Sequence, residues 1–190
     1  MKSKKIFITG GNRGIGRGLV ELLSADHNVV FSVRDKQKGE ETIQNIGGVQ
    51  ASYVVMDVNE NESIKMAVKK MKNQMDSIDI LFNNAGILIP EYDVPAIETS
   101  EDSILETFGI NTLGPLRVIK SIVKLMPKGS RIINISSGMG QLHEMEGGSL
   151  AYRLSKTALN ALTKILSVEL SEDEIKVNTI CPGWVQTDMG

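Results

Sequence analysis

Residues that form disulfides and metal centres are scarce in this sequence of 190 residues. Cys181 is the only cysteine, so an intrachain disulfide and a cluster of thiolate ligands are excluded. Histidine occurs only at His27 and His143, which excludes a histidine-rich metal site. A lone cysteine is typical of a reducing compartment, so we expect a cytoplasmic protein that holds no metal.

Long apolar runs and an excess of charge are also missing. No stretch of about 18 apolar residues occurs, and the apolar segment near the N-terminus breaks at residues 9–11, which is too short for a signal peptide. The 21 basic and 23 acidic residues nearly cancel, so neither a nucleic acid nor a membrane is expected as a partner. With 41% hydrophobic residues, the chain predicts one globular domain over residues 1–190.

Short apolar runs alternate with longer amphipathic stretches along the whole chain. The predicted strands are 5–9, 28–33, 52–56, 78–83, 131–136 and 176–180; the predicted helices are 14–25, 36–46, 60–75, 101–126 (interrupted near Gly109 and Gly114) and 151–170. The strands are apolar almost throughout, which is typical of strands covered on both faces. The pattern predicts an α/β fold with a doubly wound parallel sheet of Rossmann type, whose ligands bind beyond the carboxyl ends of the strands.

A glycine-rich segment follows the first strand. Gly10, Gly14 and Gly16 lie in the loop and first helical turn after this strand, where glycines let the backbone approach a phosphate and the helix offers its N–H groups. The alternative is a plain glycine turn, but the order strand, loop, helix favours phosphate binding. The spacing differs from G-x-G-x-x-G, and no Gly-Lys-Ser/Thr follows as in a P-loop.

Cations follow the second strand, where a protein that binds NAD usually has a carboxylate. Arg34 comes directly after Val33, and Arg13 lies in the glycine-rich segment, so both could bind a 2′-phosphate. The alternative is two solvated surface arginines. Together they favour NADP, although a shift of one residue would make Asp35 an acceptor for the ribose 2′-hydroxyl.

Polar residues also follow the third and fourth strands. Asp57 and Val58 come after the third, and Asn83 to Gly86 come after the fourth. These residues could meet a ligand in the crevice, or Asp57 could cap a helix and residues 83–86 could form a turn. Residues 87–100 follow and could line a substrate pocket, although their composition names no ligand.

A tyrosine and a lysine share one face of the helix after the fifth strand. Tyr152 and Lys156 are four residues apart, and Ser136 and Ser137 end the preceding strand. A nearby ammonium would lower the pKa of the Tyr152 hydroxyl and make it a usable acid and base near neutral pH. This spacing also arises by chance, so its position after the serines is what favours catalysis.

Taken together, these motifs resemble those of the short-chain dehydrogenase/reductase family. The matches run from residue 6 to residue 189, in the family's order and spacing. They are residues 9–16, Asp57-Val58, residues 83–86, Asn111, Ser137, Tyr152-x-x-x-Lys156, and Pro182-Gly183 with Thr187. Within the family, residues 33–35, 151–156 and 181–189 are similar to the carbonyl-reductase and C-factor-like branch.

The resemblance implies hydride transfer between NADP(H) and a small carbonyl or alcohol substrate. Tyr152 would be the acid and base, and Lys156 would lower its pKa and bind the nicotinamide ribose. Ser137, preferred over Ser136 as the last serine before the loop, would polarise the carbonyl oxygen. Asn111 would hold a water molecule that links Lys156 to solvent.

The resemblance also implies the cofactor contacts and an oligomer. Contacts to NADP(H) would come from Gly10, Asn12, Arg13, Gly14, Ile15, Gly16, Arg34, Asp57, Val58, Asn84, Ala85, Gly86, Tyr152, Lys156, Pro182, Gly183, Val185 and Thr187. A homodimer or homotetramer would form through helices 101–126 and 151–170.

The sequence departs from the family pattern in two places. The loop 138–149 is slightly longer than usual, and the substrate lid, its helices and a seventh strand do not follow Gly190. We therefore expect a truncated chain or a member reduced to its cofactor half, with strand 176–180 as an uncovered edge. An alternative function is a non-catalytic NADP-binding regulatory protein or an inactive fragment.

Overall fold

One parallel sheet organises the chain in the computed structural model, which describes residues 2–47 and 50–187. Its strands are β1 (Lys5–Ile8), β2 (Asn28–Val33), β3 (Ala51–Val55), β4 (Ile80–Asn83), β5 (Arg131–Ile135) and β6 (Lys176–Ile180). They lie in the order β3-β2-β1-β4-β5-β6, and all five pairings are parallel. The predicted Rossmann-type α/β fold is confirmed, because this order reverses direction between β1 and β4.

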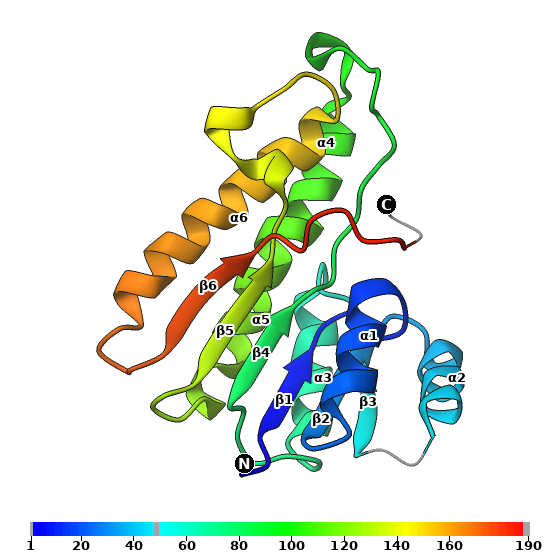
Figure 1. Cartoon of the computed structure of the whole chain (residues 1–190), viewed down its shortest axis with the longest axis vertical. Coiled ribbons are helices and arrows are strands. Elements are labelled where there is room, and N and C mark those ends of the chain that lie inside the picture. Colours follow the sequence, from blue (N-terminus) through cyan, green and yellow to red (C-terminus); the bar gives the residue numbers. More distant parts are fainter. Residues whose placement is uncertain (1, 48–49, 188–190) are drawn as a thin grey trace.

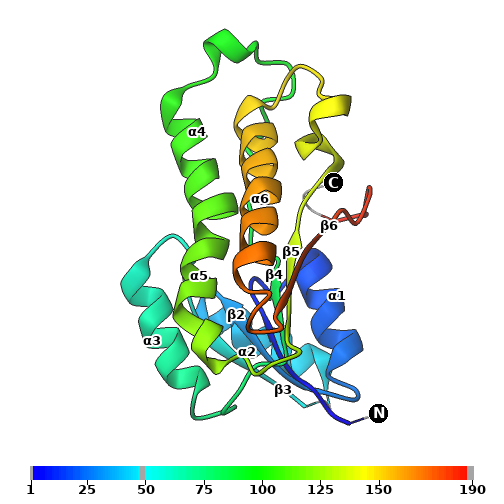
Figure 2. The same ribbon diagram turned by 90° about the vertical axis from the view of Figure 1, so that its left-hand side faces the viewer.

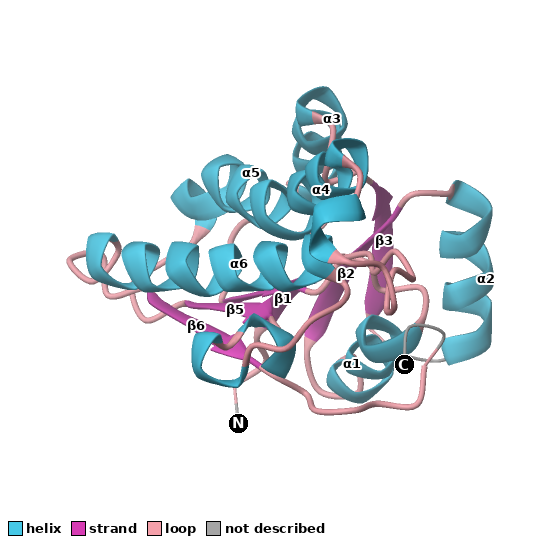
Figure 3. Ribbon diagram, turned by 90° about the horizontal axis from the view of Figure 1, so that it is seen from above, coloured by secondary structure: helices cyan, strands magenta, loops and turns pink. Residues whose placement is uncertain are grey.

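Helices pack against both faces of the sheet (Figures 1 and 3). One side carries α1 (Gly14–Leu23) and α2 (Lys36–Ile46). The other carries α3 (Asn61–Met71), α4 (Glu101–Phe108), α5 (Gly114–Ile122) and α6 (Leu150–Glu169). Short 3-10 turns are formed by Ala96–Glu98, Val123–Leu125, Gly138–Gly140 and Leu142–Glu144. Among the described residues, no helix is both long and apolar enough to cross a membrane.

The interruption predicted near Gly109 is a single π-helical turn. It spans Gly109–Leu113 and joins α4 to α5. Pi-helical turns are rare and frequently occur at functional sites. This turn carries Asn111, which is only 1% exposed, into the interior beside α6.

The two faces of the sheet form two separate apolar clusters. Phe7, Val30 and Leu81 pack against α3, α5 and α6, whereas Ile6 and Phe31 pack on the side of α1 and α2. Neighbouring residues of a strand point to opposite faces, so an apolar run buries both sides of β1 and β2. This agrees with the prediction for these two strands.

The prediction of strands covered on both faces is wrong for the outer half of the sheet. Ile133, Ile135, Asn178 and Ile180 share one face of β5 and β6, which we call the open face. Ile133 and Ile135 are half-buried, and Ile180 is 46% exposed. The reason is that the main contacts of α1 and α2 with the sheet are to β1, β2 and β3, so the open face stays partly accessible. Within the described chain β6 is an edge strand, as expected.

The carboxyl ends of all six strands lie at one edge of the sheet. Figure 2 shows α4 and the upper part of α6 extending beyond this edge, on the side away from the N-terminus. The segment that follows β6 crosses over the ends of β5 and β4 toward α1 (Figure 1). The residues predicted to bind a ligand therefore meet there.

Candidate active site

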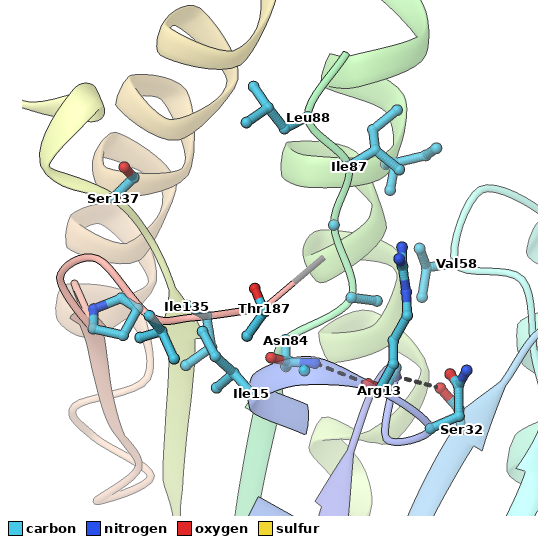
Figure 4. Close-up of a pocket in the computed structure, with 18 of the residues that line it drawn as sticks. Arg13, Ile15, Ser32, Val58, Asn84, Ile87, Leu88, Ile135, Ser137 and Thr187 are labelled. Atoms are coloured by element: carbon cyan, nitrogen blue, oxygen red, sulfur yellow. Dashed lines mark hydrogen bonds between the residues drawn. The ribbon is translucent and has the colours of Figure 1, made fainter. Parts of the chain in front are cut away.

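A cleft of about 340 Å³ opens at the carboxyl edge of the sheet. Its volume falls within the range of ligand pockets, roughly 300–1,000 Å³. Every predicted site residue lines it except Gly16 and Asn111. Figure 4 shows Ser137 on one wall, Arg13, Val58 and Ser32 on the opposite wall, and Thr187 between them.

The glycine-rich segment forms a tight loop that the fourth strand holds in place. Gly10 has φ +69° and Gly14 has φ +51°, a left-handed conformation that favours glycine. The Asn84 side-chain Nδ2 donates to the carbonyl oxygens of Thr9 and Gly10, both at 3.0 Å. A Cβ on Gly16 would lie 2.1 Å from the Gly10 oxygen, so Gly16 supports the loop from behind.

The end of β2 presents cations to the same cleft. Arg34 is exposed and lines it, together with Arg13 and Lys38. The Asp35 carboxylate instead accepts from the backbone N–H groups of Gln37 (2.7 Å) and Lys38 (3.3 Å), so it caps α2. Sequence reasoning missed Lys38, which lies in the first turn of α2, directly after the end of β2.

Ser32 is another lining residue that the sequence analysis missed. Its Oγ accepts from the Gly10 N–H at 3.2 Å, which ties β2 to the glycine loop. A serine inside an apolar strand was the available signal, because a buried hydroxyl needs a partner.

Asp57 forms a turn after β3. Its Oδ1 accepts from the Asn59 N–H at 2.8 Å, and its own N–H donates to Ser63 Oγ at 2.9 Å. The residue that precedes α3 as its cap is Glu60, so the helix-cap alternative for Asp57 is wrong. Asp57 and the buried Val58 both line the cleft, as predicted.

The two serines at the end of β5 have different partners. Ser136 Oγ donates to Asn160 Oδ1 at 2.7 Å, which occupies its hydroxyl. The Ser137 hydroxyl forms a hydrogen bond with the Tyr152 hydroxyl, and its Oγ accepts from the Met139 N–H at 3.2 Å. This geometry agrees with the choice of Ser137.

Burial controls the acidity of Tyr152. Desolvation raises the pKa of its hydroxyl above the ordinary value of 10.0, and the hydrogen bond with Ser137 opposes that rise. The prediction that Lys156 lowers this pKa is wrong for the chain as it stands. The Lys156 Nζ lies 5.5 Å from the centre of the Tyr152 ring and donates to the Ile135 carbonyl oxygen at 2.8 Å.

Lys156 is the most strongly perturbed cation of the site. Its side chain lines the cleft, yet the residue is only 5% exposed. Burial lowers its pKa from 10.5 to about 8, because desolvation penalises the ammonium form. Lys156 can therefore gain and lose a proton close to neutral pH.

Asn111 lies just behind the cleft. Its Oδ1 accepts from the Ile87 N–H, its Nδ2 donates to the Ile87 oxygen, both at 2.8 Å, and Nδ2 also donates to Ser155 Oγ at 3.1 Å. These bonds fix the start of the segment after β4. The predicted water relay to Lys156 stays a prediction.

The segment after β6 closes one side of the cleft. Pro182, Gly183, Val185 and Thr187 line it as predicted, and a Cβ on Gly14 would lie 3.5 Å from Thr187. The matched residues 188 and 189 lie outside the described residues.

Apolar side chains from three loops also line the cleft. Ile87, Leu88, Met139 and Trp184 all lie along it. Ile87 and Leu88 belong to the segment 87–100 that was expected to line a pocket. Met139 and Trp184 were missed, because only the fold brings their loops to the cleft.

The comparisons with known proteins agree with this geometry. The family model for short chain dehydrogenases matches residues 4–190. The chain is 32% identical to carbonyl reductase family member 4 of Xenopus laevis, covering 98% of this chain and 78% of that protein. It is 30% identical to the 3-oxoacyl-[acyl-carrier-protein] reductase of Escherichia coli strain K12, covering 99% and 76%.

A solved structure has the same fold. It is the NADPH-bound carbonyl reductase from chicken fatty liver, with a TM-score of 0.88 and 29% identity over 100% of this chain and 82% of that chain. The predicted likeness to carbonyl reductases is thus confirmed, and the chain belongs to the short-chain dehydrogenase/reductase family of oxidoreductases.

Proposed function

We propose that the protein is an NADPH-dependent reductase of small carbonyl compounds, which also runs in reverse on the corresponding alcohols. The observation that carries this proposal is the cluster of Ser137, Tyr152 and Lys156 on one cleft with the glycine loop. The relatives named as carbonyl reductases support it.

The residues of the cleft fit a dinucleotide. The left-handed Gly10 and Gly14 leave no Cβ between the loop and a phosphate, and α1 begins at Gly14 with its N–H groups toward the cleft. Residues 182–187 and Lys156 would hold the nicotinamide end, and Asp57 with Val58 the adenine end. The chemistry that this cofactor supplies when bound is hydride donation to a carbonyl carbon.

Each catalytic side chain has a distinct task in the proposed reaction. Ser137 donates a hydrogen bond to the carbonyl oxygen and stabilises the charge that develops there. Tyr152 gives its proton to that oxygen, and its raised pKa keeps the proton in place until it is needed. Lys156 supplies positive charge beside Tyr152 and, with its pKa of about 8, can replace the proton.

Arg34 supports NADPH over NADH. Its side chain lines the cleft where β2 ends, and the carboxylate of the next residue, Asp35, already caps α2. We expect Arg34→Ala to raise the Kd of NADPH roughly ten- to a hundredfold, as for a lost charge-assisted hydrogen bond, and to leave the Kd of NADH unchanged. Calorimetric titration measures both, with Arg17→Ala on α1 as the control. Equal loss of both cofactors would contradict the 2′-phosphate role.

Uncharged, apolar carbonyl compounds are the proposed substrates. The substrate side is lined by Ile87, Leu88 and Met139. Residues 87–100 and 138–149 contain five carboxylates and no lysine or arginine: Glu91, Asp93, Glu98, Glu144 and Glu146. An anionic substrate would be repelled there.

The decisive experiment follows NADPH oxidation with small uncharged aldehydes. We expect the wild type to oxidise NADPH and Tyr152→Phe to lose the activity. A wild type no faster than Tyr152→Phe would refute the enzyme proposal, and tight NADPH binding without turnover would favour the non-catalytic regulatory alternative. An anionic 2-oxo acid in parallel tests the substrate class.

The predicted homodimer or homotetramer remains a proposal. Its support is a row of exposed apolar side chains on α4 and α6, at Leu105 (68%), Leu154 (45%), Ile165 (54%) and Val168 (61%). Light scattering of the wild type and of Ile165→Lys tests it. The cytoplasmic location also stays a prediction.

A further inference from the structure

A buried arginine lies next to the proposed catalytic tyrosine. Arg153 follows Tyr152 on α6, and the residue is only 7% exposed. Its Nε donates to the Gly148 carbonyl oxygen at 3.0 Å, and its Nη2 lies 3.3 Å from Glu146 Oε2. Both partners belong to the loop between Ser137 and α6, so Arg153 ties this loop to the helix that carries Tyr152.

The same stretch of loop is locked to the segment after β4. Gly148 has φ +74°, and a Cβ there would lie 2.0 Å from the Tyr92 carbonyl oxygen. The next residue, Ser149, donates its N–H to the Glu91 oxygen at 2.9 Å. The backbone of residues 148–149 therefore contacts residues 91–92 directly, and Arg153 binds the Gly148 carbonyl oxygen from α6.

Two segments form the substrate wall of the cleft, and this contact joins them. We call residues 87–95 and 138–149 the substrate loops. The first is fixed near β4 by Asn111 through Ile87. Its far part is fixed where Gly148 and Ser149 meet it, so the position of both loops relative to Tyr152 depends on Arg153.

Burial of the Arg153 guanidinium costs stability, which indicates that Arg153 serves to position the loop rather than to stabilise the fold. The Arg153 guanidinium loses its hydration on burial. Its carboxylate partner Glu146 is 82% exposed, so the ion pair stabilises the fold only weakly. Residues 142–147 of this loop are exposed, and the bond from Arg153 to the Gly148 carbonyl fixes the end of that exposed stretch.

We propose that Arg153 is a positioning residue that anchors the substrate loops on α6 and thereby sets where a carbonyl substrate lies relative to Tyr152. This role rests on the proposed reductase function. Arg153 touches neither substrate nor cofactor, because it does not line the cleft.

Three variants separate the contacts. Arg153→Met keeps an unbranched apolar stem as far as the position of Nε and removes both donors. Arg153→Lys keeps the charge and one donor group, and Glu146→Gln removes only the ion pair. For Arg153→Met we expect kcat/KM for an uncharged aldehyde to fall about tenfold or more, mainly through KM, with the Kd of NADPH within about twofold of wild type. Arg153→Lys should recover part of the loss, and Glu146→Gln should change kcat/KM less than about twofold.

Hydrogen exchange of the backbone provides a readout that needs no turnover. The Ser149 amide, which donates to the Glu91 oxygen, should exchange about tenfold faster in Arg153→Met, whereas the amides of β4 and β5 stay as in wild type. Unchanged exchange in the loop would overturn the anchoring role, and so would a Kd of NADPH that rises in step with KM. If the wild type reduces no carbonyl, the proposed function fails while this exchange test still decides whether Arg153 anchors the loop.

Discussion

The buried ammonium group of Lys156 lowers the stability of the folded protein. Its pKa is lowered to about 8, so between about pH 8 and 10.5 the unfolded chain binds more protons than the folded chain. Stability therefore rises with pH through that window. Below it the burial penalty is complete and amounts to about 3 kcal/mol, from a pKa lowered by about 2.5.

We expect Lys156→Met to be more stable than the wild type at neutral pH. The gain in the free energy of unfolding should be about 2 kcal/mol, since loss of the hydrogen bond to Ile135 offsets about 1 kcal/mol. The gain should shrink as the pH approaches 10. Urea unfolding at both pH values measures it, and a variant less stable than wild type at neutral pH would show that burial of the ammonium is not costly.

Ser137 tunes the acidity of Tyr152. The hydrogen bond between the two hydroxyls lowers a pKa that burial raises, so Ser137→Ala should raise the pKa of Tyr152 further. The alkaline limb of carbonyl reduction should then move to higher pH, and the rate should fall about a hundredfold with the loss of the donor. Profiles of kcat/KM against pH measure both. Ser136→Ala, whose hydroxyl bonds Asn160, should leave the limb in place.

The residues that line the cleft could be predicted at this scale, but their pKa shifts could not. Spacing placed Tyr152 and Lys156 on one helical face, and the structure brings them to one cleft with Ser137. The direction of the Tyr152 pKa shift depends on desolvation by residues distant in sequence, which no local pattern contains. Arg153 was missed for the same reason, because only the loop at Gly148 makes it a buried residue.

At the scale of elements, the start of α1 depends on one close packing contact. A Cβ on Gly16 would lie 2.1 Å from the Gly10 oxygen and 2.4 Å from Asn84 Nδ2. Backbone cannot move aside as a flexible side chain can. The junction of β1, the glycine loop and α1 therefore admits no larger residue at this position.

Gly16→Ala should consequently destabilise the protein by about 1–3 kcal/mol and raise the Kd of NADPH at least about tenfold. Gly18→Ala is the matched control, since it lies on the same helix and its Cβ would meet nothing within 4 Å. That control should be neutral or more stable by up to about 1 kcal/mol. Thermal unfolding and NADPH titration compare the two, and equal effects would rule out a specific role for the contact.

Element types were predictable from periodicity, whereas several boundaries were not. The helix predicted over 60–75 is α3 at Asn61–Met71, and the strand predicted over 78–83 is β4 at Ile80–Asn83. Met75 and Ile78 are nevertheless buried, so apolar character extended both predictions past the regular structure. The π-helical turn at Gly109–Leu113 has no periodicity of its own, and only the break could be seen.

At the scale of the whole molecule, the open face is the main surface that the sequence reading did not anticipate. The apolar strands predicted helices on both sides, but the main contacts of α1 and α2 with the sheet are to β1, β2 and β3. Ile133, Ile135 and Ile180 remain accessible on β5 and β6. An apolar surface next to an edge strand favours self-association.

The 190-residue chain should therefore bind the dye ANS in its folded state. The double variant Ile133→Thr with Ile180→Thr should bind much less dye and stay monodisperse at higher concentration. Leu22→Thr, which removes an isolated exposed side chain from α1, is the control and should change neither property. Dye binding that is equal in all three proteins would place the accessible apolar surface elsewhere.

The segment after β6 also gives the molecule a built-in optical probe. Trp184 is the only tryptophan of the chain, is 85% exposed, and lines the cleft in the segment after β6. All tryptophan emission therefore originates at the rim of the site. Because the reduced nicotinamide ring absorbs where tryptophan emits, energy transfer from Trp184 would report occupancy of the cleft in the unlabelled protein, and in each variant with the same single chromophore.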